Sequence, residues 1–244
     1  MTESEWLGCQ TRPNGMVTFI QRKASYRKLQ LIACGVCRLT NIYLTDQRFN
    51  DAIRAMEQHA DGELSNEEFV KIRASTWELP CDYPKEPFDY EDKRQIGQYA
   101  ALAITAALNP DVRLAASGSI YFVTMGTKWM KPKGQWKQAN MQLRQNICAI
   151  VHEIIGNPFQ KWSQFPPWFE GALIQPDGKI VRTTDTVRGL SETIHQLQAF
   201  DRLPILADAL EEAGITDAAL LAHCRSEQPH IRGCWALDVV RGKT

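Results

Sequence analysis

Cysteine and histidine side chains gather at two places in the sequence where their spacing could bind zinc. Cys34 and Cys37 are separated by two residues, a spacing that lets two thiolates reach one tetrahedral ion. Four more potential ligands follow one another near the C-terminus: His223, Cys224, His230 and Cys234. His230 and Cys234 are four residues apart and would share one face of a helix. Two ligands from each place would complete a structural zinc site joining the two ends of the chain.

The same residues can also be explained as part of the hydrophobic core. Cys34 and Cys37 fall inside a continuous apolar helical pattern, whereas cysteine ligands of zinc usually lie in turns. Free cysteine is among the most often buried residue types. We therefore expect these cysteines in the core and assign no metal and no cofactor. The sequence alone leaves the zinc alternative open for both groups of residues.

Motifs that identify an enzyme are absent from the sequence. There is no Gly-x-Ser-x-Gly elbow, no glycine-rich phosphate loop, no dinucleotide fingerprint and no His-Glu-x-x-His helix. His152 and Glu153 could supply a base and a carboxylate, but neighbouring residues on a helix point in different directions. We therefore assign no catalytic residue, and an enzyme of unrecognised type is the third of three functional hypotheses.

Charge is distributed unevenly along the chain. Residues 112–152 contain no Asp or Glu, and within them lysines alternate with two indoles in a loop broken by Gly and Pro. Six side chains are the candidate contacts for nucleic acid or another partner: Lys128, Trp129, Lys131, Lys133, Trp136 and Lys137. Such a loop suits phosphates and stacked bases. Alternatively, the lysines are solvated or pair with the acidic residues 57–92 of the same chain.

Composition places the chain among ordinary globular proteins. Of its 244 residues 44% are hydrophobic, and 28 Lys and Arg balance 28 Asp and Glu, so no net field attracts nucleic acid or an anionic membrane. No apolar run is long enough for a membrane span, and the N-terminus does not resemble an export signal. With seven cysteines, an odd number, we expect reduced thiols, a cytoplasmic location and no membrane partner.

Helical periodicity dominates the pattern of apolar residues. Capping boxes begin at Thr2 and Ser65, and residues 25–44 predict a central helix. Residues 118–126 are rich in β-branched and aromatic side chains and predict one strand, and residues 175–178 predict the turn of a small hairpin. We expect a mainly α-helical single domain, 1–244, with its N- and C-terminal helices packed together and with residues 80–141 as a subsidiary lobe.

Both ends of the chain resemble a large uncharacterised family of bacterial paralogues. The resemblance rests on MTESEWL at residues 1–7, SYRKLQLIACGVCR at 25–38, GNPF at 156–159, AFDRLPILADALEEAG at 199–214, HCR at 223–225 and HIRGCW at 230–235. That family has no established activity, and its members are accessory proteins, sometimes found with interaction domains. The resemblance implies a non-enzymatic protein-interaction or accessory module with a protein partner. Nucleic-acid binding through residues 128–137 is the alternative.

Overall fold

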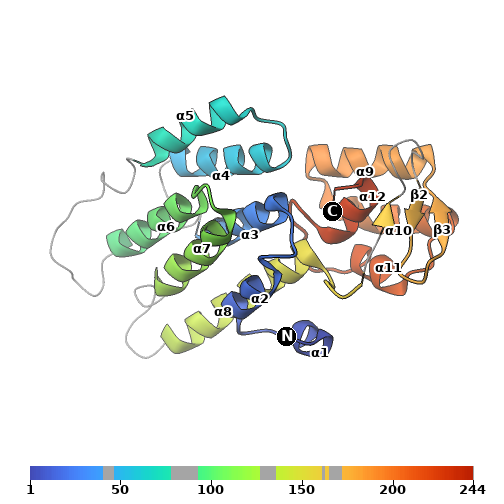
Figure 1. The fold of residues 1–244 in the computed structure, drawn as a ribbon, viewed down its shortest axis with the longest axis horizontal. Coiled ribbons are helices and arrows are strands. Elements are labelled where there is room, and N and C mark those ends of the chain that lie inside the picture. Colours follow the sequence, from blue (N-terminus) through green and yellow to red (C-terminus); the bar gives the residue numbers. More distant parts are fainter. Residues whose placement is uncertain (41–46, 78–92, 127–135, 161–162, 165–171, 244) are drawn as a thin grey trace. The chain divides into compact units, whose positions relative to one another are not determined.

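The computed structural model describes residues 1–40, 47–77, 93–126, 136–160, 163–164 and 172–243, and these are mainly α-helical (Figure 1). The predicted fold class is therefore confirmed. The chain divides into two compact units, residues 1–152 and 153–244. Whether they form one domain, whether the terminal helices pack together and whether 80–141 is a separate lobe stay predictions. None of the described helices has the length and apolar character needed to cross a membrane.

The first unit is built from eight helices among its described residues, the last of which continues into the second unit. They are α1 (Glu3–Leu7), α2 (Pro13–Ile20), α3 (Tyr26–Arg38), α4 (Gln47–Ala60), α5 (Asn66–Trp77), α6 (Lys93–Ala107), α7 (Val112–Gly126) and α8 (Trp136–Ile155). The predicted capping boxes are present: Thr2 and Glu5 cap α1, and Ser65 exchanges hydrogen bonds with Glu68 at the start of α5.

Helix α3 is the centre of the first unit and packs against α4, α6 and α7. Ser25 caps it, as predicted, and Leu31, Ile32 and Val36 are among its fully buried side chains. Its last turn is joined to α4 by Arg38, which donates two hydrogen bonds of 2.7 Å to the buried carboxylate of Glu57. A buried carboxylate needs such a partner because desolvation without compensation is costly.

Helix α7 corrects the prediction of a strand at 118–126. Its buried residues recur with helical spacing, as Ala115, Ser119, Ile120 and Val123 show. Small residues let α7 approach α6 closely: a Cβ on Gly118 would lie 3.0 Å from the Cβ of Ala106. The β-branched and aromatic residues therefore occupy a helix because packing against a neighbouring helix outweighs a weak local preference.

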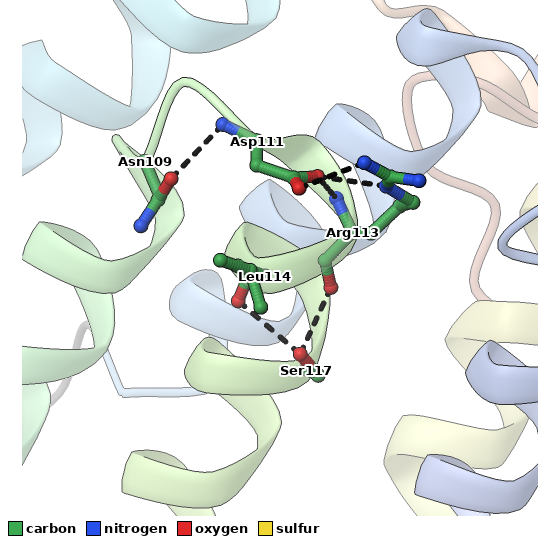
Figure 2. A network of polar contacts seen from close by, with 5 residues as sticks. All are labelled: Asn109, Asp111, Arg113, Leu114 and Ser117. Carbon is green, nitrogen blue, oxygen red and sulfur yellow. Dashed lines mark hydrogen bonds and ion pairs between the residues drawn. The ribbon is translucent and has the colours of Figure 1, made fainter.

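A short polar network lies at the connection between α6 and α7, where Asn109-Pro110 interrupts the helical pattern (Figure 2). The side-chain oxygen of Asn109 accepts the Asp111 N–H at 2.9 Å. Asp111 then accepts three N–H groups of Arg113, one from its backbone and two from its guanidinium, at 2.9–3.0 Å. Asp111 thus supplies an acceptor for the Arg113 amide in the first turn of α7, as a helix N-terminus requires.

The second unit combines a small sheet with five helical segments among its described residues. Its elements are β1 (Ser163–Gln164), β2 (Ala172–Ile174), β3 (Ile180–Arg182), α9 (Asp185–Leu197), the 3-10 helix η4 (Phe200–Arg202), α10 (Leu203–Glu212), α11 (Ala218–Cys224) and α12 (Trp235–Arg241). The strands pair antiparallel in the order β1-β2-β3, so the predicted hairpin is confirmed. Buried Gln175, in its turn, accepts the N–H groups of Thr216 and Asp217 at 2.9 Å and so fixes the start of α11.

Gly156 allows the chain that leaves α8 to pass close to Trp235. Its φ of +67° is unfavourable for other residues, and a Cβ there would lie only 2.7 Å from the indole. Gly178, in the hairpin turn, has a φ of +87°, but a Cβ there would meet nothing within 4 Å. Both glycines therefore have a positive φ, but only Gly156 is also packed closely against another side chain.

We expect Gly156→Ala to destabilise the protein more than Gly178→Ala. Both changes place a side chain at positive φ, which costs about 1–2 kcal/mol, whereas only Gly156→Ala also forces overpacking, worth about 1–3 kcal/mol more. Urea denaturation followed by circular dichroism measures the free energies of unfolding. Equal losses for the two variants would show that the contact with Trp235 is not constraining.

Candidate functional site

The predicted basic loop lies largely outside the described residues. This is the case for Lys128, Trp129, Lys131 and Lys133. Trp136 and Lys137 form the first turn of α8, where the indole is 38% exposed and the Lys137 ammonium lies 6.0 Å from its ring centroid. These two side chains are thus neighbours at the surface, and contact of the whole loop with a partner stays a prediction.

Cys34 and Cys37 lie in the core of the first unit, on the buried side of α3. Burial raises the pKa of the Cys37 thiol to about 12 and that of the Cys34 thiol well above its ordinary value. Within the described part of the chain, neither thiol belongs to a group of three or more side chains that could hold a metal ion, in contrast to Cys234. Core packing explains them.

In the second unit, three of the C-terminal candidates converge on a residue that the sequence did not place with them. The group consists of Glu153, His223, His230 and Cys234, and we refer to it as the Glu-His-His-Cys cluster. One carboxylate oxygen of Glu153 lies 3.0 Å from Nδ1 of His230, and the other lies 3.2 Å from Nε2 of His223. Sγ of Cys234 lies 3.3 Å from that same Nε2 and 4.0 Å from Nδ1 of His230.

Each member of the cluster is positioned by the end of an element or by a turn. Glu153 lies in the last turn of α8 and His223 in the last turn of α11. His230 belongs to the connection that follows, and Cys234 is the N-cap residue of α12. Gly233 has a φ of +91°, which lets the chain turn directly before Cys234. Segments about 70 residues apart in sequence therefore meet at one point.

Ring contacts and one hydroxyl also orient the two imidazoles of the cluster. The ring centroids of His223 and His230 lie 4.9 Å apart in a T-shaped arrangement, and the Trp235 ring lies 5.0 Å from that of His223. The hydroxyl of Ser226 lies 3.4 Å from Nε2 of His230, the nitrogen that points away from Glu153. The imidazoles are therefore held in orientation by contacts other than those to the carboxylate.

Burial and hydrogen bonding have opposite effects on the pKa values of Glu153 and His230. Burial of Glu153 acts to raise its pKa, but the hydrogen bonds from His223 and His230 outweigh it, and the pKa is lowered. Burial acts to lower the pKa of His230, but the bond to Glu153 outweighs it, and the pKa is raised. Burial and the nearby Glu153 charge raise the pKa of the Cys234 thiol well above its ordinary range. A charged carboxylate is therefore stabilised by two imidazoles.

The geometry does not match a catalytic relay of thiol, imidazole and carboxylate. In such a relay one ring nitrogen contacts the nucleophile and the other contacts the carboxylate. Here Nε2 of His223 faces both the Cys234 sulfur and a Glu153 oxygen. Nδ1 of His230 likewise faces both groups. The cluster is instead a set of donor atoms directed at one point, all within 4.8 Å of one another, as metal ligands are.

The neighbours of the cluster in sequence have different environments. Nε2 of His152 lies 3.2 Å from the carbonyl oxygen of Cys9, and its ring packs against Trp6, both within the first unit. The expectation that His152 and Glu153 do not act together is thus consistent with the structure. Cys224 is fully buried, and burial raises the pKa of its thiol to about 12. Only three of the four C-terminal candidates therefore belong to the cluster.

The sequence singled out Glu153 only together with His152 and did not place it with the C-terminal ligands, because that association depends on tertiary packing. Glu153 lies 70 residues before His223, on an amphipathic helix where polar residues are common. Its one sequence signal is its position three residues before Gly156, where the helix stops and the chain turns.

Comparison with known proteins identifies no relative: no family model, no curated protein and no solved structure matches the chain. The resemblance to a family of bacterial paralogues therefore stays a prediction.

Proposed function

We propose that the protein is a non-enzymatic protein-interaction or accessory module of the cytoplasm. The observation that carries the non-enzymatic part of this proposal is the burial of Glu153 and Cys234 in the Glu-His-His-Cys cluster. Cys234 is 0% exposed and Glu153 is 7% exposed, so a substrate could reach neither the thiol nor the carboxylate. An active site needs reacting groups that a substrate can contact.

A pocket in the first unit gives the enzyme hypothesis little support. It has a volume of about 220 Å³, below the usual range for small-molecule sites. It lies between α4 and α5 and is lined by Arg48, Asp51, Ala52, Ile72, Ser75 and Thr76. These residues include no histidine or cysteine that could pair with the serine or threonine hydroxyls as a base or nucleophile.

Helix α7 supplies a reason to favour a protein partner. Leu114 and Tyr121 are seven residues apart and so share one face of the helix, and they are 58% and 53% exposed. The opposite face of α7 fills the core of the first unit. Exposed aromatic and aliphatic side chains on a rigid helix are typical contacts in protein interfaces.

The partner hypothesis is tested by photo-crosslinking in the cells that produce the protein. A photoreactive amino acid at position 121 is expected to give a discrete covalent adduct with a protein, and Leu114→Ser should weaken that adduct by removing a neighbouring apolar contact. The same probe at Lys71, on the well-exposed face of α5, is the control. No adduct from position 121, or the same adducts from both positions, would contradict the proposal.

Nucleic-acid binding is the second candidate, favoured by the neighbouring Trp136 and Lys137 at the exposed start of α8. If a base stacks on the indole, Trp136→Ala should cost about 1–3 kcal/mol of binding free energy. Anisotropy of a labelled single-stranded oligonucleotide measures this, and the affinity should fall steeply as salt rises. Met141→Ala, also exposed on α8, should change little. Absence of binding at low salt would reject this candidate.

A further inference from the structure

We propose that Glu153, His223, His230 and Cys234 bind one divalent transition-metal ion, zinc by preference, in the second unit. The ion has a structural role, and the proposal does not depend on the identity of a partner. The cluster supplies four protein ligands, of which Glu153 and Cys234 are buried and the two histidines partly buried, as in structural zinc sites, whereas catalytic zinc sites have three protein ligands and keep one position for water.

The separations within the cluster agree with the edges of a tetrahedron around zinc. Bonds of about 2.0–2.1 Å to nitrogen and oxygen and about 2.3 Å to sulfur give edges of roughly 3.3–3.6 Å. Two edges run from Sγ of Cys234 to the imidazole nitrogens and are 3.3 and 4.0 Å. Glu153 approaches the same nitrogens at 3.0 and 3.2 Å through its two different oxygens. With one donor atom taken from each residue, all four lie within 4.8 Å of one another, so small side-chain adjustments would bring them to bonding distance.

The orientation of the imidazoles supports the same assignment. Each ring directs one nitrogen to the common point, Nε2 from His223 and Nδ1 from His230. Metal-binding histidines usually hydrogen-bond through the other nitrogen to an outer group, which fixes the tautomer. For His230 that group is Ser226, whose hydroxyl lies 3.4 Å from Nε2.

Charge and ligand type point to zinc among the divalent ions. A glutamate carboxylate and a cysteine thiolate would together neutralise one doubly charged ion, so the buried complex carries no net charge. Two nitrogens, one sulfur and one oxygen form a set that suits zinc and other late transition metals. Calcium and magnesium prefer sites built from oxygen atoms alone.

The competing explanation is a hydrogen-bonded network without an ion. In that state Glu153 is paired with the two imidazoles, and Cys234 is a protonated thiol near His223. The two explanations differ in what Cys234 does: it is a thiolate ligand in one and a replaceable small side chain in the other. A measurement that detects a bond between sulfur and metal therefore distinguishes them.

The test is cobalt binding to the purified full-length chain after treatment with a chelator. We expect one equivalent of Co²⁺ to bind and to give a sulfur-to-cobalt charge-transfer band in the near ultraviolet, which Zn²⁺ then displaces. Cys234→Ser should abolish the band, and Glu153→Gln and His223→Ala should each abolish binding at equal concentrations of protein and metal. Ser226→Ala, which removes the outer contact of His230, should weaken binding about tenfold.

Two control variants remove the same residue types elsewhere. Cys148→Ala changes a thiol buried in α8, and His59→Ala changes the histidine at the end of α4, so both should keep one equivalent and an unchanged band. Circular dichroism of each variant shows whether it folds. Because the band is measured first on the unaltered chain, a misfolded variant does not affect the main result. The proposal would be overturned if the unaltered chain gave no charge-transfer band with one equivalent of Co²⁺, or if the band persisted in Cys234→Ser.

Discussion

Burial of the Glu153 carboxylate is the constraint on which the arrangement of segments in the second unit depends. A carboxylate out of contact with water must be compensated by hydrogen bonds or opposite charge. Here the compensation comes from His223 and His230, at 3.2 and 3.0 Å, which lie on different segments from Glu153. The end of α8, the end of α11 and the turn before α12 must therefore keep their relative positions within this unit. Gly156 and Gly233, both at positive φ, provide the backbone turns that make this possible.

The same constraint separates binding from catalysis at this cluster. Burial excludes substrate from the thiol and the carboxylate, and each imidazole faces both groups with a single nitrogen. A proton relay needs an accessible nucleophile and a ring that bridges two partners. A structural metal ion requires several donor atoms directed at one point, and these atoms need not be accessible to a substrate. Either a hydrogen-bonded network or a bound ion would thus offset the free-energy cost of burying the Glu153 charge.

The first unit is organised by close packing rather than by charge. Helices α6 and α7 approach each other because Gly118 and Ala106 face each other at their contact. Ser119, also in the contact, is fully buried and satisfies its hydroxyl by donating to backbone carbonyls. At the edge of this packed core, the Arg38 and Glu57 ion pair links α3 to α4. On the outer face of α7, Leu114 and Tyr121 remain exposed.

The helical class, the capping boxes at Thr2 and Ser65 and the hairpin turn around Gln175 could be predicted from the sequence, because periodicity and turn chemistry act between residues near in the chain. Features that depend on contacts between distant residues followed only from the tertiary structure. It made residues 118–126 a helix, since packing outweighs a weak local preference. Burial of Cys34 and Cys37 in the core agrees with the sequence prediction, whereas the approach of Glu153 to His223, His230 and Cys234 was not predicted. Local spacing could identify the last three as potential ligands, but a carboxylate 70 residues away becomes their partner only when the chain folds.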